Sequence, residues 1–214
     1  LGTAVLIASL RNPALLAKTA ATLDSISKGR LELGVGMGWQ EEEYHAAGVP
    51  FEKRSEIFWE TLKICQLLWE SSPASFEGNI YKFEDIWCQP QPFQGSDLPL
   101  LFGLKMTQET AQKIANIGHG WIPIKTDTDF IANGKELLAA AFKKNNIKNI
   151  PRIRGQLPTQ IDASGAPNLE LTLQQAEKSI AAGLTEIEIF PINFVRSKED
   201  IKPVLSAISD LSKL

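Results

Sequence analysis

Two hydrophobic patterns alternate along the chain. Short apolar runs predict strands, and apolar residues spaced three and four positions apart predict helices. The expected strands cover residues 2–8, 31–39, 100–102, 121–124, 152–159 and 186–190. The expected helices cover residues 13–28, 54–70, 107–116, 128–145, 173–182 and 198–213. Strand and helix therefore alternate about six times, which predicts a parallel α/β fold.

Two parallel architectures fit this alternation: an open doubly wound sheet and a (β/α)8 TIM barrel. The very short strands favour the barrel. The chain enters mid-strand without an initiator Met, so we expect about the first two βα units of the barrel to be missing. Residues 1–214 would then form a single partial TIM-barrel domain, with an irregular insertion around residues 72–99. The open sheet edges of such a fragment favour pairing with another chain, so a homodimer is compatible with the sequence.

Three glycines alternate with apolar residues in the strand over residues 31–39. Because alternate strand positions face the same side, Gly34, Gly36 and Gly38 leave one face without side chains. A flat ligand could lie on that face, or the glycines could simply allow close packing inside a barrel. A dinucleotide fingerprint is excluded, because Trp39 stands where the last glycine of GxGxxG is required.

Residues 103–107 connect a strand to the start of a helix. Helix N-terminal N–H groups, the Lys105 ammonium and the Thr107 hydroxyl could together bind a phosphate. The alternative is an ordinary connection with a solvated lysine.

The overall composition narrows the class of partner. The chain is 43% hydrophobic and 22% charged, with a formal net charge of −3, so nothing indicates a basic face for nucleic acid or for an anionic membrane. No apolar run approaches the roughly 18 residues of a membrane span. We therefore expect a small-molecule substrate. The two cysteines lack CxxC spacing, which favours a reducing, cytoplasmic location.

Other candidate side chains carry weaker signals. His45 and His119 have no metal-ligand spacing, so no metal site is expected. The run Glu41–Glu43 could hold a catalytic carboxylate or form a solvated helix start, and Glu43 is the member expected to turn inward.

Several segments together resemble the luciferase-like monooxygenase superfamily, in particular its F420-dependent oxidoreductase branch. They are LGTAVL (1–6), RNPALLAK (11–18), ATLD (21–24), GRLELGVG (29–36), GW (38–39), EY (43–44), FEG (76–78) with Tyr81, PxP (90–92) with Gln94, and GxGW (118–121). The resemblance implies a (β/α)8 barrel with F420 or FMN at the C-terminal mouth of its strands. It also implies oxidoreductase chemistry on a small organic substrate, either monooxygenation or F420-dependent hydride transfer.

The same resemblance implies roles for individual residues. Ala4 and Val5 match a pair that is often joined by a non-proline cis peptide bond behind the cofactor ring. Gly36, Met37 and Gly38 would border the ring. The cofactor phosphate would be held by Gly103, Leu104, Lys105, Met106 and Thr107. Some F420 relatives carry a glutamate where Trp39 stands, and the acid or base residues of the first two strands are absent here, so the catalytic residues stay unknown. A non-catalytic flavin-binding remnant and a flavin-free barrel enzyme are the alternatives.

Overall fold

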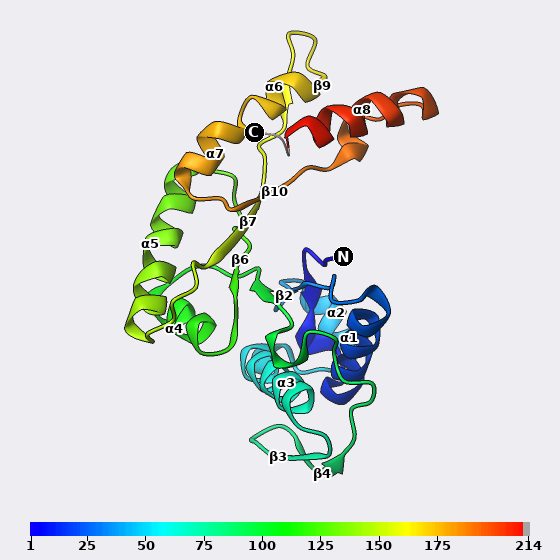
Figure 1. Cartoon of the computed structure of the whole chain (residues 1–214), viewed down its shortest axis with the longest axis vertical. Helices are drawn as coiled ribbons and strands as arrows, with labels where there is room; N and C mark the ends of the chain where they lie inside the picture. Colours follow the sequence, from blue (N-terminus) through cyan, green and yellow to red (C-terminus); the bar gives the residue numbers. More distant parts are fainter. Residues whose placement is uncertain (212–214) are drawn as a thin grey trace. The chain divides into compact units, whose positions relative to one another are not determined.

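The computed structural model describes residues 1–211, which divide into two compact units. The first unit comprises Leu1–Leu104 and Gln112–Ile122, and the second comprises Lys105–Ala111 and the chain from Pro123 onward. The helices and most of the strands are labelled in Figure 1.

The first unit contains a parallel sheet in the strand order β1-β2-β5-β6. These strands are β1 (Leu6–Ile7), β2 (Leu33–Gly36), β5 (Leu100–Phe102) and β6 (Gly120–Trp121). Its helices are α1 (Pro13–Ser27), α2 (Glu41–Ala46), α3 (Arg54–Glu70) and most of α4 (Gln108–Ile117), with 3-10 turns η1 (Ala8–Leu10), η2 (Phe51–Lys53) and η3 (Gly95–Asp97).

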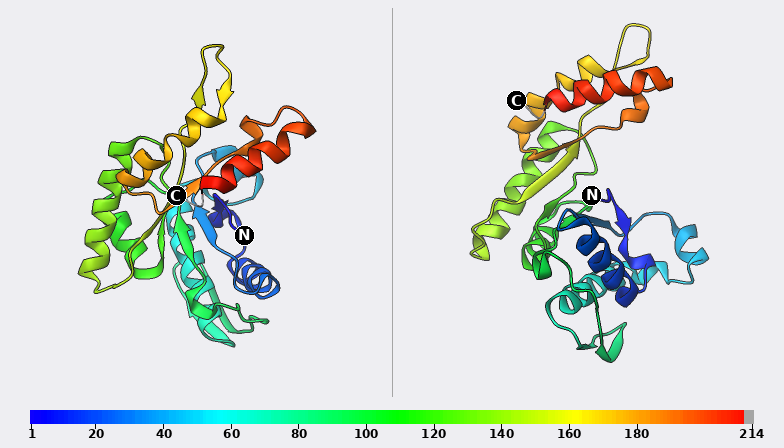
Figure 2. Two further views of the ribbon diagram at one scale, coloured as in Figure 1. Left: turned by 45° about the horizontal axis from the view of Figure 1, so that its top comes forward. Right: turned by 45° about the vertical axis from the view of Figure 1, so that its right-hand side comes forward.

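Helices α1 and α3 pack side by side, as both views in Figure 2 show. Asn12 caps α1 by accepting a hydrogen bond from the Leu15 N–H, and Pro13 occupies its first position. The indole of Trp69 on α3 donates to the Ala17 carbonyl of α1 at 3.0 Å. α3 also covers the sheet, because Phe58 and Trp59 contact the ring of Phe102. The helix-covered face of the sheet is therefore the apolar core of this unit.

Residues 72–99 hold an antiparallel hairpin of β3 (Ala74–Glu77) and β4 (Lys82–Ile86). Two buried carboxylates tie this segment to the helices. Glu60 on α3 accepts the N–H groups of residues 79–81, and Asp24 on α1 accepts both the backbone N–H and the side-chain amide of Gln94. The quoted family segments ATLD and PxP with Gln94 thus meet in space.

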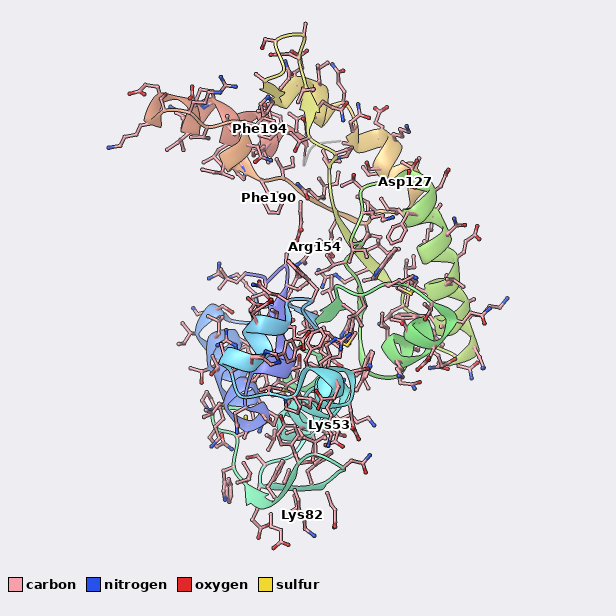
Figure 3. All side chains as sticks on the ribbon, turned by 180° about the vertical axis from the view of Figure 1, so that it is seen from behind. Lys53, Lys82, Asp127, Arg154, Phe190 and Phe194 are labelled. Atoms are coloured by element: carbon pink, nitrogen blue, oxygen red, sulfur yellow. The ribbon has the colours of Figure 1, made fainter. Side chains whose placement is uncertain are left out.

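The second unit contains the parallel pair β7 (Arg152–Gln156) and β10 (Glu186–Glu188). Ile153 and Leu157 are buried on one face of β7. Arg154, labelled in Figure 3, alternates with them and is buried on the other face. The remaining elements are α5 (Thr128–Lys144), β8 (Gln160–Ile161), β9 (Pro167–Asn168), α6 (Leu169–Leu173), α7 (Ala176–Ala182), η4 (Pro191–Asn193) and α8 (Lys198–Leu211).

The prediction of a parallel α/β fold is confirmed, while the barrel and the single partial domain stay predictions. The helix expected over residues 173–182 corresponds to α7, and a separate short helix, α6, ends at Leu173. The run Glu41–Glu43 forms the first turn of α2, as one of the two interpretations of that run expected. The helix expected to reach residue 213 is described only to Leu211, and its last predicted residues lie outside the described part.

Candidate functional site

The side chain of Val5 lies against two glycines at the carboxyl ends of neighbouring strands. A Cβ built on Gly36 would lie 2.7 Å from Cγ2 of Val5, and one built on Gly103 would lie 2.7 Å from Cγ1. Real Cβ atoms do not come this close, so both positions require glycine while Val5 stands there. Val5 remains 38% exposed. The three residues therefore form a low apolar surface on the sheet face opposite to Phe102.

Gly34 lies deeper on the same face. A Cβ there would collide with the Thr3 carbonyl oxygen and would lie 2.9 Å from Cδ1 of Ile122. The Thr3 hydroxyl donates to the Gly34 carbonyl at 2.7 Å. The face left bare by the glycines is thus covered at Gly34 by the chain at residue 3, and the exposed part of the surface lies at Val5.

The peptide bond between Ala4 and Val5 is cis, as the resemblance implied. Ala4 is exposed beside it. Gly38 does not continue the strand alternation, because β2 ends at Gly36 and Gly38 has a φ of +73°. Gly38 therefore allows a left-handed turn at this point.

The backbone after β2 is held by a buried hydrogen-bond network. The Tyr44 hydroxyl donates to the Met37 carbonyl, and the Ser9 hydroxyl donates either to that carbonyl, at 3.3 Å, or to the Tyr44 hydroxyl. Tyr44 is fully buried. The expectation that Glu43 turns inward is wrong: Glu43 is exposed, and the neighbouring Tyr44 occupies the interior. Its role was missed because an isolated tyrosine in a polar stretch carries no periodic signal.

Residues 103–107 cross from the first unit to the second, so each side is described separately. In the first unit, the Gly103 N–H donates to the Val35 carbonyl at 2.8 Å, and the buried Leu104 carbonyl accepts from the Trp121 indole at 2.8 Å. In the second unit, Lys105 is exposed, Met106 is half-buried, and Thr107 caps α4. The Thr107 side chain accepts the Thr110 N–H at 3.1 Å. The segment thus ends in a helix N-terminus whose capping hydroxyl is already engaged.

The Nδ1 hydrogen bond of His119 and the contact of His45 with Glu41 do not involve Val5, Gly36 or Gly103. His119 Nδ1 accepts the Leu100 N–H at 3.2 Å, which stabilises the turn before β6, and the exposed His45 faces Glu41 at 3.5 Å. Across residues 1–211, no three His, Cys, Asp or Glu side chains are grouped so that they could hold a metal ion.

A charged cluster on β7 and β10 was not expected from the sequence. Glu186 accepts from Arg152 and Arg154, and Glu188 lies 3.9 Å from the Nε of Arg154. Burial alone would raise the pKa of Glu186, but the hydrogen bonds from the two arginines outweigh it and lower that pKa. Burial raises the pKa of Glu188, which Arg154 offsets only in part. The sequence did carry a signal for this cluster. Arginines stand at positions 152 and 154 and glutamates at 186 and 188, so like charges lie on one face of each strand.

Comparison with known proteins assigns the chain to a family. Residues 1–166 match the family described as luciferase-like monooxygenase. An uncharacterized protein of Mycobacterium bovis is 37% identical over 129 residues, which cover 60% of this chain and 45% of that protein. The match thus spans less than half of that relative's length.

Two solved structures share the fold. An F420-dependent secondary alcohol dehydrogenase, in complex with an F420–acetone adduct, superposes with a TM-score of 0.75 at 17% identity, covering 97% of this chain and 78% of that one. The oxygenating constituent of 3,6-diketocamphane monooxygenase from Pseudomonas putida, in complex with FMN, gives 0.69 at 11% identity, covering 95% and 79%. In the described part of this chain, every helix is too short or too polar to cross a membrane.

Proposed function

Because the chain belongs to the luciferase-like monooxygenase family, we propose that it is an oxidoreductase that uses F420 or FMN to act on a small organic substrate. The fold that we expect for the whole protein is a (β/α)8 barrel. We expect the protein to act in the reducing environment of the cytoplasm. One protein of the same fold is F420-dependent and another is in complex with FMN, so the fold supports both cofactors equally.

The observation that carries this proposal is the packing of Val5 against Gly36 and Gly103. Two adjacent strands lack side chains there, and the exposed residue between them is a small apolar one. Such a surface accepts the face of a flat ring without steric conflict and without burying a charge. We therefore assign Ala4, Val5, Gly36, Met37 and Gly38 to the wall beside the cofactor ring.

The phosphate of either cofactor would be held by Gly103 to Thr107. Lys105 is exposed and its positive charge can pair with a phosphate, while the N-terminus of α4 supplies partial positive charge. The Thr107 hydroxyl, engaged in capping, orients these N–H groups. Leu104 is held in place by the Trp121 indole.

When bound, the cofactor supplies either hydride transfer or oxygen activation. The residues of this chain bind and orient it. Val5 and Met37 exclude water from one side of the ring, and the hydrogen bonds from Tyr44 and Ser9 fix the Met37 carbonyl. Val5 and Met37 carry no titratable group, so the wall is a positioning surface rather than an acid–base site.

The test is a fluorescence titration of the chain with FMN, riboflavin and F420. FMN and riboflavin share the ring, but riboflavin lacks the phosphate. We expect Lys105→Ala to weaken FMN binding about fivefold, as one exposed charge pair contributes ~1 kcal/mol, and to leave riboflavin binding unchanged.

Lys148→Ala is the matched control, because Lys148 is also exposed but lies before β7. It should change neither affinity. If the unmodified chain binds neither F420 nor FMN, the proposed function is wrong. If Lys105→Ala weakens FMN and riboflavin equally, the phosphate assignment is wrong.

A further inference from the structure

A pocket of about 310 Å³ lies between helices α3 and α4, beside the turn of the β3–β4 hairpin. Helix α3 contributes Glu56, Trp59 and Lys63, which follow one another at helical spacing and therefore share one face of the helix. Lys113 on α4 and Asn79 in the hairpin turn line its other sides. All five residues belong to the first unit. The volume is in the range of small-molecule sites, roughly 300–1,000 Å³, and we call this site the α3–α4 pocket.

The walls of the α3–α4 pocket are held by contacts within the protein. The indole of Trp59 stacks on Phe102 of β5, with 5.5 Å between the ring centroids and 20° between the planes. The buried carboxylate of Glu60 holds the hairpin turn by accepting its backbone N–H groups. The Gln66 amide donates to the Ile117 carbonyl at 2.6 Å and so ties the end of α4 to α3. Walls that are formed in advance reduce the entropic cost of binding a ligand.

Opposite charges stand at the two ends of the α3 wall. Glu56 and Lys63 are seven residues apart, which is about 10 Å along a helix, and Trp59 lies between them. Oε1 of Glu56 accepts the side-chain amide of Asn79 at 3.1 Å. Within residues 1–211, the Glu56 carboxylate makes no other hydrogen bond or ion pair, and the Lys63 ammonium makes none. Both groups can therefore pair with charges on a ligand.

The lining of the pocket carries no net charge, because two lysines balance two glutamates. The second lysine, Lys113, places its Nζ 5.4 Å from the centroid of the Trp59 ring, and the second glutamate is Glu60. A ligand with a single charge would meet like charges as well as opposite ones, whereas a ligand with both charges can pair at each end. An apolar chain between those two charges would lie on the indole of Trp59.

We propose that the α3–α4 pocket binds an elongated zwitterion of the ω-amino acid class. The ammonium of the ligand pairs with Glu56, its carboxylate pairs with Lys63, and its methylene chain lies on the indole of Trp59. The site is separate from the proposed cofactor wall, because Trp59 packs on Phe102 and the wall lies on the opposite face of the sheet. Binding in this pocket therefore goes beyond the proposed function and does not depend on the cofactor.

Three probes of one chain length test the pairing of both charges: 6-aminohexanoate carries both, hexylamine carries only the ammonium, and hexanoate carries only the carboxylate. Binding is followed by NMR through the indole N–H signals of the five tryptophans, and Trp59→Phe assigns the signal of Trp59. We expect 6-aminohexanoate to shift that signal and to bind roughly fivefold more tightly than either other probe, the upper end for one exposed charge pair. Added FMN should leave its affinity unchanged.

Two variants assign the charges. Glu56→Gln should lower the affinity for 6-aminohexanoate about fivefold without weakening hexanoate, and the glutamine oxygen can still accept the Asn79 amide. Lys63→Met keeps an aliphatic side chain and should lower the affinity for 6-aminohexanoate about fivefold without weakening hexylamine. Glu70→Gln and Lys53→Met are the matched controls, because both residues are exposed and lie outside the pocket. Neither control should change the affinity of any probe.

Four results would overturn the inference. They are a failure of 6-aminohexanoate to bind, equal affinities for the three probes, a shift confined to tryptophans other than Trp59, and equal effects of the pocket variants and their controls. Cofactor binding is measured on the same samples by fluorescence. A chain that binds 6-aminohexanoate at Trp59 but binds neither FMN nor F420 would support this site and overturn the proposed function alone.

Discussion

The isopropyl group of Val5 occupies the space in which a side chain on Gly36 would stand, with 2.7 Å between Cγ2 of Val5 and the position of that missing Cβ. The carbonyl of Gly103 lies 3.4 Å from the same position. The glycine is thus required by a residue 31 positions earlier in the chain. Because Val5 fills the space beside Gly36, the proposed cofactor wall has no side chain that projects from β2 at this position.

Gly36→Ala should therefore lower the free energy of unfolding by about 1–3 kcal/mol, the usual cost of adding a methyl group to a filled site. Combining it with Val5→Ala removes both Cγ atoms, so the double variant should recover part of the loss. Urea unfolding of the two single variants and the double variant measures this coupling. Leu15→Ala, at a 65% exposed position on α1, should change stability by no more than about 0.5 kcal/mol. Strictly additive effects would show that Val5 and Gly36 do not share this space.

Asp24 offers a second test, on the attachment of residues 72–99. Its carboxylate is fully buried and accepts from the backbone and side-chain amides of Gln94. Asp24→Asn replaces one acceptor oxygen with a donor that faces N–H groups, so we expect a loss of about 2–3 kcal/mol. Urea unfolding gives the loss, and limited proteolysis should show earlier cleavage within residues 72–99. Asp85→Asn, on an exposed residue of the same segment with φ +50°, should be neutral. Equal stability of the two variants would contradict the role of Asp24.

Glu186 should make the stability of the protein depend on pH. Its pKa is held below the ordinary value of 4.5 by Arg152 and Arg154. A lowered folded-state pKa means that its contribution is present above about pH 4.5 and is lost as the pH falls further. Glu186→Gln should thus cost about 2 kcal/mol at pH 7, the worth of hydrogen bonds to a charged group, and the difference from the unmodified chain should shrink below pH 4.5. Thermal unfolding of the variant and of the unmodified chain, measured from about pH 3 to about pH 7, gives this difference in stability at each pH.

Glu188→Gln is the matched control, since it lies two residues along the same strand and its pKa is raised instead. A raised pKa costs stability as the pH rises above the ordinary value of 4.5. Between measurements at about pH 4 and about pH 7, the free energy of unfolding of Glu188→Gln should therefore rise relative to that of the unmodified chain. The relative free energy of unfolding of Glu186→Gln should fall over the same interval. The same sign for both variants would show that the arginines do not distinguish the two carboxylates.

Local patterns were sufficient for several elements. The helix expected over residues 54–70 and the strand over residues 100–102 have the bounds of α3 and β5. The helix has apolar residues at helical spacing, and the strand is a short apolar run that ends at Gly103, so each can be recognised without knowledge of its neighbours. For helix α2 the sequence indicated only a possible start at Glu41–Glu43, because the helix is short and buries only Tyr44. The Tyr44 hydroxyl donates to the Met37 carbonyl, a contact made only in the folded chain.

The amino-acid sequence by itself determined the alternation of strands and helices, the strand face without side chains and the family resemblance, because each depends on the order of residue types. Only the tertiary structure decided what fills that face: Thr3 covers Gly34, Val5 lies between Gly36 and Gly103, and Trp39 stands free on a backbone held by Ser9 and Tyr44. Apart from the contact of Tyr44 with Met37, these contacts join residues about 30 to 100 positions apart. The packing of neighbouring strands determines these contacts. The periodic pattern within one strand does not specify which distant side chain will pack against it.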